Sequence, residues 1–209
     1  MSTIKLHHFP LSGHSHRVEL FLSLLGLDAE IITVDLANGA HKTEDFLKKN
    51  SFGQVPVLED GDITLSDSNA IITYLAKKYD DTHSWLPIDA VAAAQVQRYL
   101  SISSGLLAYG PAQARLANVF NAAIDKEKVL ASSHNLLAVL NAELAERDWL
   151  VGDQPTLADV ANYSYIAHAP EGDVALDEYS NVKAWLHRFE NLPRFIPMQA
   201  TAVGLAVAA

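Results

Sequence analysis

The chain has 209 residues, of which 49% are hydrophobic, enough to bury the core of one large domain or two modest ones. A formal net charge of −10 makes nucleic acid and anionic membranes poor partners. Cysteine is absent, which excludes disulfides, thiolate metal sites and a thiol oxidoreductase. No apolar run reaches the roughly 18 residues of a membrane span, and the start lacks a signal-peptide pattern. We therefore expect a cytoplasmic protein.

The first 80 residues alternate between strand and helix patterns. Residues 4–9 and 30–34 read as strands, and the apolar run between them predicts a helix that ends at Gly26. A short helix is expected over 43–49, then two strands around a tight Asp60-Gly61 turn, then a helix over 68–78. A strand–helix–strand unit in one sheet crosses over right-handed with parallel strands. The order β-α-β-α-β-β-α therefore predicts a thioredoxin-like domain over residues 1–80.

Strand signals stop after a linker expected at residues 81–88, and residues 89–209 predict an all-helical domain. Apolar periodicity of helical type covers about 89–118, 121–146, 156–168 and 181–191, with ends uncertain by about 2–4 residues. Thr156 and Asp159 have the spacing of a helix capping box, with Asp in place of the usual Glu or Gln. The alanine-rich tail, 200–209, is expected to be partly loose.

Three features of the first domain suggest a ligand. Pro56 offers no N–H to a strand ladder, which favours an edge position and leaves backbone groups of Val55 for another partner. Asp67 and Ser68 open a helix, where N–H groups favour a bound carboxylate. The pair His41-Lys42 is a local basic patch in an acidic chain.

Residues 54–58 followed by 67–71 resemble the glutathione-binding half of a cytosolic glutathione transferase. The resemblance extends in architecture over nearly the whole chain, with its motifs concentrated in residues 10–72. It implies a cis bond before Pro56, pairing of Val55 with the cysteinyl backbone of glutathione, and an acidic residue and serine that hold the γ-glutamyl end. The residues that it implies for glutathione are His41, Lys42, Gln54, Val55, Pro56, Asp67 and Ser68.

Residues 10–18 resemble the serine motif of the phi-, zeta- and theta-like branches, with the catalytic serine at Ser12. A cysteine-like thiol has a pKa near 8.5, so an enzyme that uses glutathione must stabilise the thiolate. A Ser12 hydroxyl and a helix N-terminus would do so together. Ser15 is the alternative donor and also a plausible N-cap, and Gly13, His14 and His16 depart from the commoner residues of the motif.

Other residues have weaker signals. His14, Tyr109 and Arg115 are candidates for the electrophile site in or beside the helical domain, although a core aromatic and a surface arginine are equally good interpretations of the last two. The histidines lack the convergent acidic partners of a metal site, so no metal is expected. Phe52, in a loop beside the ligand segment, either anchors a homodimer, as the family implies, or packs within its own domain.

The resemblance thus implies a homodimeric enzyme with glutathione as co-substrate, acting on a small hydrophobic electrophile. Substitution, conjugate addition, isomerisation and peroxide reduction all stay open. The alternative is a catalytically silent binding or scaffold module of the same fold, in which ligand residues would be expected to decay.

Overall fold

The computed structural model describes residues 4–201, which form two compact units. The first comprises residues 4–83 together with Pro193–Gln199, and the second comprises 84–192 with 200–201. The division falls inside the linker expected at 81–88. Nothing in the sequence indicates that residues 193–199 join the first unit, and the expectation for the tail beyond residue 201 lies outside the described residues.

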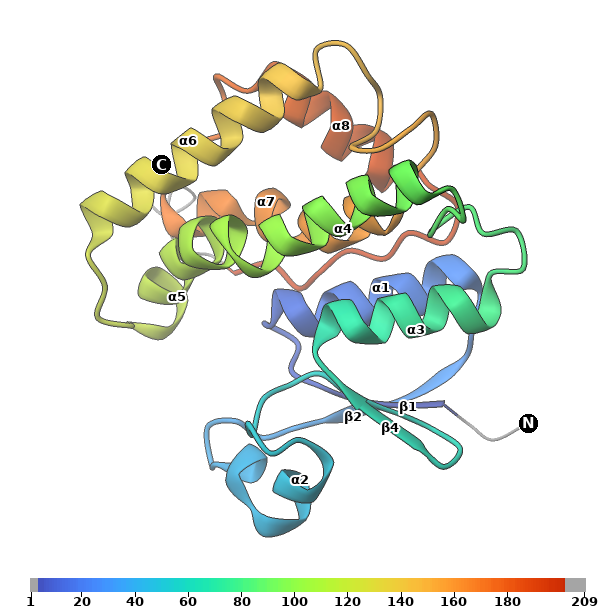
Figure 1. Cartoon of the computed structure of the whole chain (residues 1–209). Helices are drawn as coiled ribbons and strands as arrows, with labels where there is room; N and C mark the ends of the chain where they lie inside the picture. The colour runs from blue at the N-terminus through green and yellow to red at the C-terminus, as the bar shows by residue number, and fades with distance from the viewer. Residues whose placement is uncertain (1–3, 202–209) are drawn as a thin grey trace. The chain divides into compact units, whose positions relative to one another are not determined.

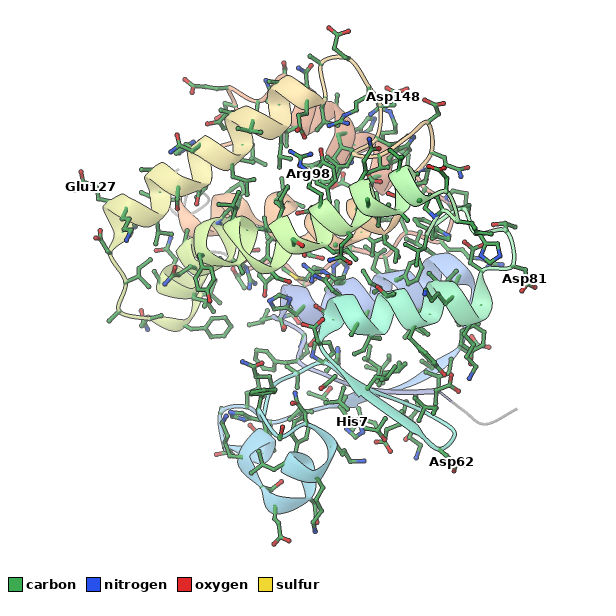
Figure 2. All side chains as sticks on the ribbon, in the orientation of Figure 1. His7, Asp62, Asp81, Arg98, Glu127 and Asp148 are labelled. Carbon is green, nitrogen blue, oxygen red and sulfur yellow. The ribbon has the colours of Figure 1, made fainter. Side chains whose placement is uncertain are left out.

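The first unit is built on a four-stranded sheet in the order β2-β1-β3-β4. The strands are β1 (Ile4–His8), β2 (Ala29–Thr33), β3 (Val57–Asp60) and β4 (Ile63–Ser66). β1 pairs parallel with β2 and antiparallel with β3, and β3 pairs antiparallel with β4. Leu6, completely buried, lies opposite both Ile31 and Leu58. This confirms the expected thioredoxin-like arrangement of a parallel βαβ unit and a hairpin, whose turn Asp62 marks in Figure 2.

Three helices and one short turn complete this unit: α1 (Gly13–Leu25), η1 (Ala40–Lys42), α2 (Glu44–Lys49) and α3 (Ser68–Tyr79). Figure 1 shows α1 and α3 side by side over one face of the sheet, with α2 on the opposite side. α1 ends where Gly26 adopts a left-handed φ of +69°, as the sequence predicts. It begins with Ser12, not Ser15, as its N-cap, since the Ser12 hydroxyl accepts the Ser15 N–H.

Pro56 does not lie on an edge strand, so the edge position expected from the sequence is wrong. β3 is an interior strand, and its pairing with β1 and β4 begins at Val57. Pro56 avoids the ladder because it precedes the first paired residue. The Val55–Pro56 bond is cis, as the family resemblance implies. Val55 therefore stands at the end of the ladder, with its side chain against the buried cluster of Val34, Phe46 and Val57.

In the described part of the second unit, all regular secondary structure is helical, which confirms the expected all-α domain. The helices are α4 (Ala90–Ser104), η2 (Ala108–Ala112), α5 (Gln113–Phe120), α6 (Lys126–Glu143), α7 (Leu157–Ala167), η3 (Ala169–Gly172) and α8 (Ser180–Glu190). α4 lies beside α7 in Figure 1. Arg98 of α4, labelled in Figure 2, reaches Glu143 of α6 at 2.8 Å.

The first long helical stretch, expected at about 89–118, is broken. α4 ends at Gly105, and the chain kinks at Gly110, whose φ of −110° and ψ of −107° are not helical. Pro111 follows and has no N–H to continue the helical ladder. A Cβ at Gly110 would lie 3.2 Å from the Ser133 hydroxyl oxygen, so the absence of a side chain here lets η2 approach α6 closely.

Residues 193–199 are held to α1 by two hydrogen bonds from side chains to carbonyl groups. The Ser23 hydroxyl donates to the Arg194 carbonyl at 2.7 Å, and His16 Nε2 donates to the Ile196 carbonyl at 2.9 Å. His16 is therefore a buried histidine that braces the fold.

Two features are absent from residues 4–201. None of the helices described there combines the length and apolar character that a membrane crossing requires. In the same residues no group of three or more His, Cys, Asp or Glu side chains is arranged to hold a metal ion.

Candidate functional site

A cavity of about 700 Å³ opens in the first unit between η1, the loop before β3 and the start of α3. Its wall brings together side chains that are up to 54 positions apart in the sequence, from His14 to Ser68. All seven residues that the family resemblance implies for glutathione line it: His41, Lys42, Gln54, Val55, Pro56, Asp67 and Ser68. His14 and Phe52 line it as well.

One end of the cavity is formed by the N-terminus of α3. Asp67 caps this helix by accepting the Ala70 N–H at 2.9 Å. Its φ of +72° lies in the left-handed region that a residue with a side chain rarely adopts. Ser68 is the first helical residue and lines the cavity with its hydroxyl group nearly buried. The partial positive charge of the helix end and these polar groups favour an anionic group here.

A buried arginine stands directly behind this helix end. Arg17 of α1 is only 1% exposed, and its Nη1 donates to Ser68 Oγ and to Asn69 Oδ1, both at 2.8 Å. His14, one turn earlier on α1, places Nδ1 3.1 Å from the same Ser68 oxygen. Burial and then the charge of Arg17 lower the pKa of His14 to about 3. His14 is therefore neutral at physiological pH.

The opposite end of the cavity is basic. Lys42 Nζ donates to the carbonyl groups of Phe52 and Gly53, both at 3.3 Å, and so ties η1 to the loop before β3. His41 Nδ1 is buried without a hydrogen-bond partner among residues 4–201. An imidazole N–H and an ammonium group can each donate a hydrogen bond to a carboxylate.

The loop between α2 and β3 is braced from below by Asn50. Its amide Nδ2 donates to the Gln54 carbonyl at 2.8 Å, and its Oδ1 accepts the Phe52 N–H at 3.1 Å. Gly53 has a φ of +58°, and a Cβ there would lie 2.7 Å from the His41 carbonyl oxygen. Only glycine therefore lets this loop approach η1.

The two serine candidates differ in accessibility. Ser12 is half-buried at the start of α1, and its oxygen accepts the Ser15 N–H at 3.2 Å, so its own hydrogen can donate to a further group. Ser12 is not part of the cavity wall, although His14, two residues later, is. Ser15 is completely buried, and its hydroxyl accepts the Phe9 N–H at 3.2 Å. The structure thus leaves Ser12 as the more accessible hydroxyl group.

Phe52 is 78% exposed in the single chain. The alternative in which it packs within its own domain is therefore wrong. An aromatic ring held in a braced loop and turned to solvent has the properties of an interface residue.

The remaining electrophile candidates differ as well. Tyr109 is 71% exposed and lines a shallow apolar groove of the second unit together with Ile102 and Leu106. Arg115 is 1% exposed, and its Nε donates to Glu171 at 2.5 Å. Arg115 is therefore neither a surface arginine nor accessible to an electrophile, because α5 turns it inward against η3.

Glu171 gives a prediction for acid stability. Burial alone would raise its pKa, but hydrogen bonds from His168, the Thr201 N–H and Arg115 outweigh this effect and lower it to about 2. The unfolded chain then binds more protons than the folded chain below the ordinary glutamate pKa of about 4.3. As pH falls from 5 to 2, the wild-type chain should lose about 2 kcal/mol more unfolding free energy than Glu171→Gln. Urea unfolding across this pH range tests the prediction, with the exposed Glu146→Gln as control. An equal dependence of unfolding free energy on pH in all three proteins would contradict it.

Six residues of the site were not found from the sequence: Arg17, Leu36, Asn50, Gly53, Ser66 and Asn69. Arg17 lies within the serine motif, but sequence alone does not distinguish a buried arginine from a solvated one. Gly53 precedes the strand pattern, and this position is a signal that the loop needs a positive φ. The two asparagines have the composition of any loop or cap.

Comparison with known proteins shows similarity over both units. The family model described as the glutathione S-transferase N-terminal domain matches residues 2–77, and that of the glutathione S-transferase C-terminal domain matches residues 98–193. Glutathione S-transferase 3 from Zea mays is 35% identical over 93% of this chain and 92% of its own length. Glutathione S-transferase theta-2 from Homo sapiens is 36% identical over 72% of this chain and 65% of its own length.

Solved structures agree with the fold. A glutathione S-transferase from Pseudomonas fluorescens superimposes with a TM-score of 0.89 at 31% identity, over 95% of this chain and all of that one. A glutathione transferase homologue from Drosophila mojavensis, solved with bound glutathione, gives a TM-score of 0.85 at 28% identity, over 92% of this chain and 90% of that one.

Proposed function

The chain belongs to the glutathione S-transferase family, and we propose that it binds glutathione in the cavity of its first unit and activates the thiol with Ser12. The observation that carries this proposal is the single cavity lined by all seven residues expected to hold glutathione. The relative from Drosophila mojavensis, which contains glutathione, supports the same ligand.

The cavity has two ends that suit the two carboxylates of the tripeptide. The γ-glutamyl carboxylate binds at Ser68 and the N-terminus of α3, and the glycyl carboxylate binds at His41 and Lys42. Between them, Val55 stands at the end of the ladder and offers its backbone to the cysteinyl residue. The thiol then lies toward the start of α1.

Ser12 and the α1 N-terminus stabilise the thiolate in this arrangement. The Ser12 hydroxyl donates to sulfur while its oxygen accepts the Ser15 N–H, and the helix end adds partial positive charge. The thiol proton passes to water. The thiolate forms a carbon–sulfur bond with a small hydrophobic electrophile, and the leaving group departs with the electron pair of the broken bond.

The proposal includes a homodimer and a cytoplasmic location. Phe52 is the exposed aromatic side chain that we expect to insert into the partner subunit. The cytoplasm keeps glutathione reduced, as a thiol nucleophile requires. Conjugation of reactive electrophiles there is a detoxification reaction.

Binding and turnover together test the function. The protein should be retained on immobilised glutathione, elute with free glutathione, and conjugate a generic aromatic electrophile. Retention without turnover, unaffected by Ser12→Ala, would favour the silent scaffold module instead. No retention and no turnover would exclude both.

The close approach of Gly53 to η1 gives a second, more local prediction. Gly53→Ala forces a side chain into a positive φ and against the His41 carbonyl, so η1 must move and glutathione affinity should fall about tenfold. Gly39→Ala is the matched control, because Gly39 also has a positive φ, +75°, but a Cβ there meets nothing within 4 Å. Gly39→Ala should lose about 1 kcal/mol of stability through its positive φ alone, and Gly53→Ala should lose more because of the added clash. Calorimetric titration with glutathione measures the difference, and equal affinities of the two variants would contradict it.

A further inference from the structure

Ser68 has a single hydroxyl hydrogen, and the groups around its oxygen restrict the direction in which that hydrogen can point. Arg17 Nη1, 2.8 Å from Ser68 Oγ, can only donate, so the serine oxygen accepts there. His14 Nδ1 lies 3.1 Å from the same oxygen and 3.4 Å from Arg17 Nη1. A proton on Nδ1 would face the guanidinium N–H. Nδ1 is therefore the acceptor of the Ser68 hydrogen, and the ring carries its own proton on Nε2.

The groups around His14 favour a neutral ring whose Nδ1 accepts a hydrogen bond. Arg17, on the same helix, is the charged group within hydrogen-bonding distance of Nδ1, and α3 contributes the uncharged Ser68 and Asn69. The carboxylate of Asp67 is engaged by the Ala70 N–H, and the basic pair His41-Lys42 lies at the other end of the cavity. The lowered pKa of His14, about 3, agrees with a neutral ring.

We propose that His14 competes with the γ-glutamyl carboxylate of glutathione for the hydroxyl hydrogen of Ser68, and thereby weakens the hold of this site on its ligand. The inference rests on the proposed function, because that function places the carboxylate at Ser68. A hydroxyl group donates one hydrogen bond at a time. To donate to the carboxylate, the Ser68 hydroxyl group must turn away from His14 Nδ1, which lies 3.4 Å from Arg17 Nη1. The backbone N–H groups of α3 bind the carboxylate in either case.

The proposal predicts that loss of a residue from the cavity wall strengthens glutathione binding. His14→Leu removes the acceptor at similar size, so glutathione should bind about fivefold more tightly, whereas loss of a structural or ligand-contacting residue weakens binding. His14→Asn keeps an acceptor near the Nδ1 position and should give a smaller gain. The exposed His187→Leu of α8 is the matched control and should leave affinity unchanged.

Two further measurements locate the effect at Ser68. Ser68→Ala should weaken glutathione binding less in the wild-type chain than in His14→Leu, because the hydroxyl is released only in the latter. The analogue 4-aminobutyryl-cysteinylglycine, which lacks the γ-glutamyl carboxylate, should gain nothing from His14→Leu. Calorimetric titration gives each affinity, and thermal unfolding checks that each variant is folded.

Nitrogen NMR of the ligand-free wild-type protein gives a test that needs no variant. His14 should show an unprotonated Nδ1 and a protonated Nε2 at neutral pH, and the Nδ1 resonance should shift when glutathione binds. A protonated Nδ1, equal or weaker binding by His14→Leu, or equal effects of Ser68→Ala in both backgrounds would overturn this inference alone. If neither the wild-type chain nor His14→Leu binds glutathione, the proposed function fails and this inference fails with it.

Discussion

Ser12→Ala should raise the pKa of the bound glutathione thiol by about one to two units, the size of a hydrogen bond to a charged group. At pH 6.5 the conjugation rate should then fall about 10–100-fold, because a smaller fraction of bound glutathione is thiolate. The deficit should shrink as pH rises past the thiol pKa of the variant. Thiolate absorbance of bound glutathione and a pH–rate profile measure both quantities.

The Ser12 variant also loses a helix cap, so a control is needed. Ser12→Thr keeps the hydroxyl group and the cap, and should restore most of the activity. Asp125→Ala removes the cap of α6, where Asp125 accepts the Lys128 N–H, and should lower stability by about 1 kcal/mol without moving the thiol titration. An unchanged titration in Ser12→Ala would assign thiolate stabilisation to the helix end alone, since Ser15 is completely buried.

Of the single changes that we predict in the second unit, Asp159→Ala should be the most destabilising. The Asp159 carboxylate is completely buried and accepts the N–H groups of Leu150 at 3.0 Å and Thr156 at 2.8 Å, and the indole N–H of Trp185 at 2.9 Å. Its removal leaves these three donors and the Thr156 hydroxyl group, which donates to Asp159 at 3.2 Å, without their acceptor, which should lower the unfolding free energy by about 4 kcal/mol. For a chain of this size the melting temperature should fall by about 10 °C.

Two controls separate the buried carboxylate from ordinary capping. Asp159→Asn keeps one oxygen and should lose about half as much stability. Asp89→Ala removes an exposed cap at the start of α4 and should lose only about 1 kcal/mol. Trp185 fluorescence follows local exposure during unfolding. If Asp159→Ala lost no more unfolding free energy than Asp89→Ala, the predicted role of the buried carboxylate would be contradicted.

The fold was predictable where local signals and topology agree. The strand–helix–strand start, the Asp-Gly hairpin turn and the capping box at Thr156 all formed as expected, because each rests on short-range chemistry. The break in the first helical stretch had a visible signal in Gly110-Pro111, which apolar periodicity concealed. The return of residues 193–199 to the first unit depends on side-chain hydrogen bonds to distant carbonyl groups, which no local pattern predicts.

The residues expected to hold glutathione could be predicted from the sequence, whereas the buried residues behind the cavity wall could not. The loop and helix-cap residues that form the cavity wall share a motif with a known order and spacing. Arg17 and Arg115 are both buried, one behind a helix end and one in an ion pair, and sequence alone does not distinguish such arginines from solvated ones. Phe52 illustrates the reverse, since an aromatic side chain favours burial and this one is exposed.

A crystal structure of the protein soaked with glutathione tests the central claim most directly. The account predicts the tripeptide along the cavity, with its γ-glutamyl carboxylate at Ser68, its cysteinyl backbone at Val55 and its sulfur within hydrogen-bonding distance of Ser12. Glutathione bound elsewhere, or in this cavity with its sulfur turned away from Ser12, would contradict it.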